Sequence, residues 1–154
     1  MTPRQVRLVQ SSWQQVVPIQ ETAAGLFYSR LFEMDSTVAP LFKGDMVEQG
    51  RRLMTMIGFA VASLSRLDQL APLLRNLGRR HVEYGVTVAH YDTVGGAFLW
   101  TLEKGLGTAF STEVKEAWVA AYHLTASAMK EGAAQAQPGR AAMGLSLFTA
   151  DAQV

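Results

Sequence analysis

The sequence contains no cysteine, and this absence excludes several kinds of chemistry at once. Disulfide bonds, thiolate zinc sites, iron–sulfur clusters and thiol catalysis all require cysteine sulfur. Long apolar runs are also missing, because no stretch approaches the ~20 residues that cross a bilayer. The first residues, Met1-Thr2-Pro3-Arg4-Gln5, carry no apolar targeting core. These absences predict a cytoplasmic protein without a membrane-spanning segment.

The chain also has little excess charge of either sign. Its net charge is +1, and its basic residues are scattered along the sequence rather than clustered. Nucleic acids and anionic membranes are therefore not expected partners. With 154 residues, of which 49% are hydrophobic and 18% charged, the composition predicts one soluble domain with a proper core.

What the sequence does contain is helical periodicity nearly throughout. Helix starts are predicted at the Thr2 capping box, at Asp45 and at Ser111, and a helix end at Gly107. We find no β-strand alternation and no internal repeat, so the predicted fold class is all-α, with about seven to eight helices. The predicted domain covers residues 1–131. The Ala/Gly-rich segment 132–154 is predicted to be a tail.

One histidine stands out because it closes an apolar stripe. Leu70, Leu73, Leu74, Leu77 and His81 follow offsets of 0, 3, 4, 7 and 11, which place all five on one inward face of a helix. A buried imidazole needs partners for two ring nitrogens, from a side chain, a water or a metal. Taken alone, a hydrogen-bonded core histidine is the commoner interpretation.

Several motifs spread along the chain resemble those of bacterial single-domain globins and of the globin part of flavohaemoglobins. They are "LFYSRLF", "PLF", "EQGRRLM", "LGRRHVEYGV", "AHYDTVGGAFLWTL" and "EAWVAAY", in the order and spacing of that family over about residues 4–131. The resemblance implies a globin fold that holds haem b, with His81 as the axial iron ligand. His90 and His123 are the competing histidines, and the family places the ligand earlier than either.

The resemblance also assigns roles to residues far apart in the sequence. Tyr28 and Gln49 match the distal residues that face the bound gas, and Phe42 matches the aromatic residue that wedges against the haem. Further matches, each equally compatible with ordinary core packing, are Leu53 beside the ligand, Tyr91 on the proximal side, and the lining residues Ile57, Leu77, Val86, Val94 and Phe98. Arg80 or Lys43 would pair with the haem propionates, or would be solvated surface charges.

These matches imply reversible binding of O2, NO or CO, in which the Tyr28 hydroxyl and the Gln49 amide stabilise negative charge on bound oxygen. We expect a monomer or a weak homodimer. One alternative is a nitric oxide dioxygenase, which would draw electrons from a separate reductase because no flavin or dinucleotide motif is present. Another is a gas sensor or a haem-free interaction module with a globin fold.

One position departs from the family pattern on the proximal side. Relatives carry a glutamate late in the last helix, where this sequence has Ala133, and Glu131 lies two residues earlier. Two positions correspond to about 200° around a helix, so Glu131 is predicted to face away from the site. Loss of this carboxylate would weaken electron donation from His81 and favours binding over fast turnover.

Overall fold

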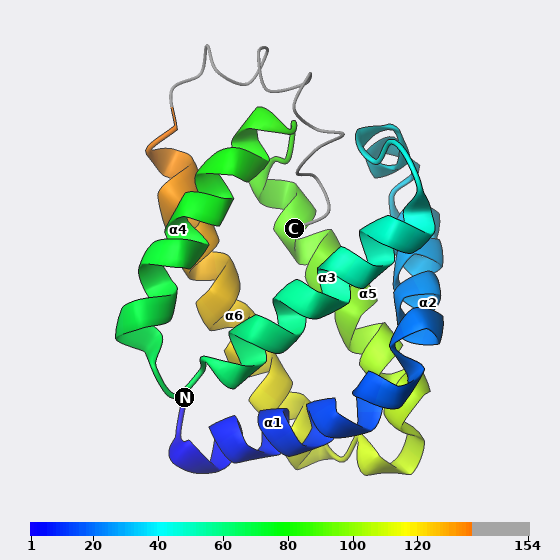
Figure 1. The fold of residues 1–154 in the computed structure, drawn as a ribbon, viewed down its shortest axis with the longest axis vertical. Coiled ribbons are helices and arrows are strands. Elements are labelled where there is room, and N and C mark those ends of the chain that lie inside the picture. Colours follow the sequence, from blue (N-terminus) through cyan, green and yellow to red (C-terminus); the bar gives the residue numbers. More distant parts are fainter. Residues whose placement is uncertain (137–154) are drawn as a thin grey trace.

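The computed structural model describes residues 1–136, which form an all-helical domain (Figure 1). Within this part of the chain there are six α-helices, fewer than the seven to eight predicted, and three short 3₁₀ helices. The elements in chain order are α1 (Pro3–Val16), η1 (Val17–Ile19), α2 (Gln20–Met34), η2 (Ser36–Leu41), α3 (Met46–Ala62), α4 (Leu67–Glu83), α5 (Val88–Leu106), η3 (Gly107–Ala109) and α6 (Thr112–Ala134).

The predicted helix boundaries are confirmed where a capping side chain sets them. Thr2 forms the capping box of α1, the Asp45 carboxylate accepts from the backbone N–H groups of Val47 and Glu48, and the Ser111 hydroxyl caps α6. Gly107 ends α5 with a positive φ, a conformation that glycine adopts without strain. The α6 helix extends to Ala134, three residues beyond the predicted end of the domain, and positions 137–154 of the predicted tail lie outside the described residues.

The helices pack against one another in pairs (Figure 1). α4 lies against α6, α2 lies against α5 and α3, and α1 crosses one end of the domain and contacts α6. The core between these pairs is rich in aromatic rings, and the buried Trp118 indole N–H donates to the Ser12 hydroxyl across 2.8 Å. None of the described helices is both long and apolar enough to cross a membrane.

The backbones of α4 and α6 lie in direct contact where the two helices cross. A Cβ added to Gly78 would overlap the Met129 carbonyl oxygen, and one added to Gly132 would overlap the Arg75 carbonyl oxygen. The two glycines thus let each helix backbone rest directly on the other. This crossing fixes the position of α4, and with it the position of His81 near the end of that helix.

Candidate functional site

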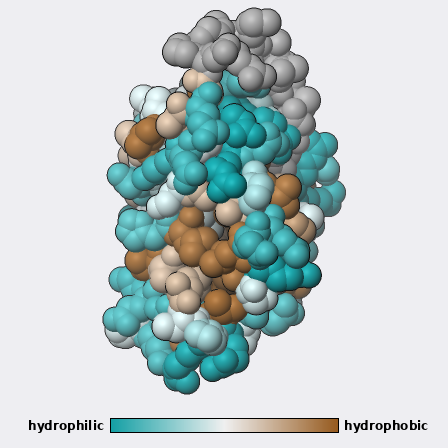
Figure 2. Space-filling model, turned by 90° about the vertical axis from the view of Figure 1, so that its left-hand side faces the viewer, coloured by the Kyte–Doolittle hydropathy of each residue, from teal (hydrophilic) through white to brown (hydrophobic). Residues whose placement is uncertain are grey.

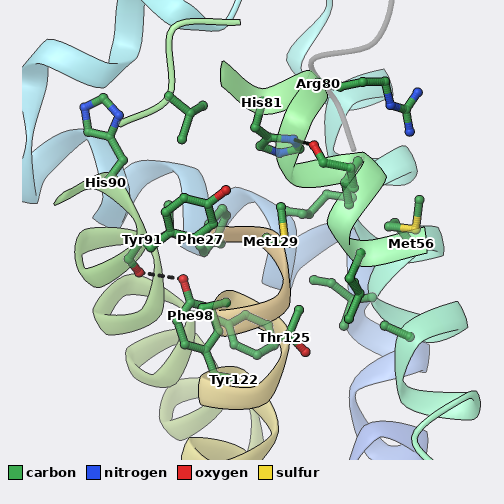
Figure 3. A pocket seen from close by; sticks show the side chains of 18 of the residues that line it. Phe27, Met56, Arg80, His81, His90, Tyr91, Phe98, Tyr122, Thr125 and Met129 are labelled. Atoms are coloured by element: carbon green, nitrogen blue, oxygen red, sulfur yellow. Dashed lines mark hydrogen bonds between the residues drawn. The ribbon is translucent and has the colours of Figure 1, made fainter. Parts of the chain in front are cut away.

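A cavity of about 360 Å³ lies in the centre of the helical domain (Figure 3). This volume is within the range of small-molecule and cofactor pockets. Its wall is formed on one side by α2, η2 and α3, and on the other by α4, α5 and α6. The residues that line it are mostly apolar and aromatic, so the cavity suits a largely apolar ligand.

The cavity brings together nearly all the site residues that the sequence predicts. Those that line it are Tyr28, Phe42, Leu53, Ile57, Leu77, His81, Val86, Tyr91, Val94 and Phe98. Gln49 is the exception, because it does not lie in the cavity wall. Other lining residues, among them Met56, Phe59, Leu73, Tyr84 and Met129, were not predicted as site residues.

His81 lies on the last turn of α4, and Figure 3 shows its ring directed into the cavity. The Nδ1 atom is 2.8 Å from the Leu77 carbonyl oxygen, one turn earlier in the same helix. A carbonyl oxygen only accepts hydrogen bonds, so Nδ1 carries a proton, and in the neutral form of the ring the lone pair is then on Nε2. This is the tautomer that binds a metal through Nε2, and the backbone bond also fixes the orientation of the ring.

The opposite wall contains a cluster of aromatic rings around Tyr28. The Tyr28 ring meets Phe42 edge-on at a centroid distance of 5.4 Å and stacks against Phe32 at 6.0 Å. The side chain of Tyr28 is only 7% exposed, and this burial raises the pKa of its hydroxyl well above the ordinary value of 10. At neutral pH the hydroxyl is therefore a proton donor held rigidly at the cavity wall.

Gln49 is buried, at 5% exposure, but its amide is engaged elsewhere. Its Nε2 donates to the Lys43 carbonyl oxygen across 3.3 Å, which ties α3 to the loop that follows Phe42. Its Oε1 is buried and has no hydrogen-bond partner among the described residues. To donate into the cavity, the Gln49 side chain would have to leave Lys43.

The wall contributed by α5 and α6 is organised around two tyrosines. The Tyr122 hydroxyl donates to the Tyr91 carbonyl oxygen across 2.5 Å (Figure 3). The Tyr91 hydroxyl is buried without a hydrogen-bond partner in the part of the chain that the structure describes. Such an orphaned donor in a cavity wall marks a place where a bound group could satisfy it.

Glu131 faces away from the cavity, in line with the helical spacing. Its side chain is 63% exposed, and its carboxylate lies 4.0 Å from the guanidinium of Arg75 on the outer side of the α4–α6 pair. Ala133 is half-buried and does not line the cavity either. No carboxylate of the α6 end therefore reaches the cavity wall, where Tyr91 lies.

The remaining histidines and basic residues occupy different places. His90 lines the cavity, but its Nδ1 accepts the backbone N–H of Thr87 across 3.0 Å as part of the α5 capping box. His123 is exposed and does not line the cavity. Arg80 lines the cavity but points away from His81 in Figure 3, whereas Lys43 is exposed and does not line it.

The buried tyrosines predict a loss of stability at alkaline pH. Burial raises the pKa of Tyr91 to about 12 and shifts the pKa values of Tyr28 and Tyr122 in the same direction, whereas tyrosines of the unfolded chain ionise near 10. Stability from the neutral hydroxyls is therefore fully present below pH ~10 and is lost as the pH rises from there through the folded-state pKa values. Urea unfolding at about pH 8 and about pH 11 should show a lower free energy of unfolding at the higher pH. Tyrosinate absorbance that titrates wholly near pH 10 in the folded protein would contradict this.

Comparison with known proteins identifies a family. The globin family matches residues 25–129 of this chain. Neuroglobin from Danio rerio is 31% identical over 139 residues, which cover 81% of this chain and 87% of that protein. Neuroglobin from Chaenocephalus aceratus is 28% identical over 146 residues, which cover 86% of this chain and 92% of that protein.

Solved structures share the fold at lower identity. A hexacoordinated heme protein from an anhydrobiotic tardigrade superimposes with a TM-score of 0.80 and 18% identity, over 88% of this chain and 96% of that one. A bacterial globin from Campylobacter jejuni superimposes with a TM-score of 0.76 and 22% identity, over 87% of this chain and 97% of that one. A flavohemoglobin from Malassezia yamatoensis with bound FAD and heme superimposes with a TM-score of 0.73 and 18% identity, over 87% of this chain but only 37% of that one.

Proposed function

The chain belongs to the globin family, and we propose that it binds haem b through His81 and binds diatomic gases reversibly. The observation that carries this proposal is the state of His81. Its ring points into an apolar cavity of about 360 Å³, and its Nδ1–H bond to Leu77 selects the tautomer that binds a metal through Nε2. Imidazole nitrogen is the usual proximal ligand of globin haem.

The chemistry of the cavity wall fits such a group. Its apolar wall would hold the two faces of a porphyrin, with Phe42 and Leu53 on one side and Leu77 and Val94 on the other. The buried Tyr91 hydroxyl, which has no partner among residues 1–136, would gain one from a bound group or its ligand. When bound, haem would supply an iron that coordinates O2, NO or CO.

Tyr28 would act as the hydrogen-bond donor to the gas. Its hydroxyl lines the cavity, and its ring is held by Phe32 and Phe42. Because burial raises its pKa, the hydroxyl keeps its proton at any physiological pH. A preorganised donor stabilises a ligand that gathers negative charge, by ~1.5–3 kcal/mol when the acceptor is ionic.

Replacing Tyr28 with phenylalanine is expected to speed oxygen release about tenfold or more, since ~1.4 kcal/mol corresponds to a factor of ten. The aromatic packing is kept, so only the donor is lost. Carbon monoxide gathers less charge than oxygen and serves as the internal control, with a much smaller change in its release rate. Stopped-flow displacement of each gas measures both rates. An unchanged oxygen release rate would remove Tyr28 from this role.

Gln49 is proposed as a second donor that acts only after a change of conformation. In the structure its amide donates to Lys43, and its Oε1 is buried without a partner among the described residues. An unsatisfied buried acceptor costs ~1–3 kcal/mol, so this arrangement is less stable than a fully bonded one. Rotation of the side chain toward the cavity would direct the Nε2 donor at a bound ligand.

The position of Glu131 favours binding over rapid turnover. Its carboxylate lies beside Arg75 on the outside of the domain, so it cannot polarise His81. We therefore propose reversible gas binding as the main function, and nitric oxide dioxygenation with a separate reductase as the second candidate. Mixing the reduced, oxygen-loaded protein with nitric oxide and a general flavin reductase distinguishes the two functions. Sustained formation of nitrate over many turnovers would make dioxygenation the main function.

A further inference from the structure

The surface between α3 and α4 carries an exposed apolar patch that is continuous with the cavity. Phe59 on α3 is 50% exposed and Leu73 on α4 is 53% exposed, although Leu73 belongs to the stripe that the sequence predicts to point inward. Both side chains also line the cavity. Figure 2 shows apolar surface gathered at the centre of the face that carries α4, surrounded by polar residues.

The packing of the helices explains why this patch exists. α3 packs against α2 and α1, and α4 packs against α6, so the cavity separates α3 from α4. Phe59 and Leu73 are apolar, exposed and part of the cavity lining, and Asn76, one turn after Leu73 on α4, is an exposed polar residue of the same lining. Other exposed apolar side chains, such as Val47 and Val88, do not line the cavity. We refer to Met56, Phe59 and Leu73 as the apolar window.

We propose that the apolar window is the route by which diatomic gases reach the cavity. This inference rests on the proposed function. O2, NO and CO are small and apolar, so they partition readily into a passage lined by hydrocarbon and thioether groups. The half-exposed side chains of Phe59 and Leu73 change rotamer on a timescale of picoseconds to nanoseconds, which suffices to open such a passage briefly.

Two other parts of the surface are less suited to this task. Arg80 and His90 also line the cavity, but their side chains are polar, and an apolar gas that passes polar groups has to displace the water that solvates them. A second hollow lies between α2 and α3, and it shares only Tyr28 with the cavity lining. The tightly packed ring of Tyr28 therefore separates that hollow from the cavity.

A route residue has a kinetic signature that differs from that of a binding residue. A side chain that only narrows the passage slows association and dissociation by the same factor, because it raises the barrier without changing either end state. The equilibrium dissociation constant then stays constant. A side chain that contacts the bound gas changes the dissociation constant, mainly through the dissociation rate.

The test uses the full-length haem-loaded protein and carbon monoxide. Leu73→Trp is expected to slow association after flash photolysis, and dissociation, each by about threefold or more, with an unchanged dissociation constant. Phe59→Ala should speed both rates by a similar factor. The two variants act in opposite directions, so a general loss of folding cannot produce both results.

Two matched controls separate the window from other effects. Gly25→Leu adds bulk to the α2–α3 hollow, where an added Cβ meets no atom within 4 Å, and should leave both rates unchanged. Val88→Trp places the same large side chain at an exposed position that does not line the cavity, and should also have no effect. The proposal is overturned if Gly25→Leu slows the rates, or if Leu73→Trp and Phe59→Ala do not alter them.

Xenon provides a readout that does not depend on gas binding at iron. NMR spectra of the methyl-labelled protein under xenon should show chemical-shift changes at the methyl groups of Met56 and Leu73. In the Leu73→Trp variant the xenon-induced change at the Met56 methyl group should disappear. Shifts confined to methyl groups of the α2–α3 hollow, such as those of Met46 and Met54, would overturn the window. A protein that binds no haem would instead refute the proposed function, and the xenon result would still decide whether the window opens.

Discussion

Replacing His81 with glycine is expected to abolish the Soret band of the haem-loaded protein, or to leave haem bound weakly and without its normal spectrum. The ring is the single imidazole that points into the cavity from α4 with its tautomer set by the Leu77 carbonyl. Removal of the proximal ligand takes away the bond to the iron, so that only the contacts of the cavity wall would hold a porphyrin. Titration of haemin into the variant, followed by absorption, measures the loss.

Imidazole added to the His81→Gly protein should restore the spectrum, because the deleted side chain leaves a space of the same shape. This rescue separates the loss of a ligand from a loss of folding. His123→Ala is the matched control, since His123 is exposed and does not line the cavity, and its spectrum should equal that of the wild type. A normal Soret band in His81→Gly without imidazole would assign the iron to another residue.

Replacing Gly132 with alanine is expected to lower the free energy of unfolding by about 3 kcal/mol or more, at the upper end of the usual cost of overpacking. The new methyl group would overlap the Arg75 carbonyl oxygen, which belongs to a helix backbone and cannot rotate away. α4 and α6 would have to move apart. Because α4 carries His81, the variant should also bind haem more weakly. Urea unfolding and haemin titration measure the two effects.

Two further variants make this prediction specific. Gly78→Ala should be destabilising in the same way, because its methyl group would overlap the Met129 carbonyl oxygen at the same crossing. Gly25→Ala is the control, since nothing lies within 4 Å of its added Cβ, and replacing a helical glycine with alanine stabilises by up to ~1 kcal/mol. Equal stability of Gly132→Ala and Gly25→Ala would show that the α4–α6 contact is looser than described.

The sequence predicts much of this architecture because its signals are local. The side-chain caps at Thr2, Asp45 and Ser111 and the glycine stop at Gly107 act on adjacent residues, and the structure confirms them. Periodicity also places His81 correctly on an inward face. The helix count is lower than predicted because the short connecting segments, including Ser36–Leu41, form 3₁₀ rather than α-helices.

The features that the sequence does not predict depend on how far apart the helices lie. Leu73 follows the periodicity of a buried stripe, yet it is half-exposed because α4 packs against α6 and is separated from α3 by the cavity. Gln49 is buried, but its contact with Lys43 depends on the path of a loop that no periodic pattern describes. Most of the predicted cavity residues could be gathered only by the family resemblance, because they lie on different helices.

The most direct test of the central claim is to locate the iron. X-ray diffraction from crystals of the haem-loaded protein, collected at the iron absorption edge, should show one anomalous peak at bonding distance from Nε2 of His81, with Tyr28 on the opposite side of the iron. A peak bonded to His90 or His123 instead, or crystals of the haemin-treated protein with no iron in the cavity, would contradict the account.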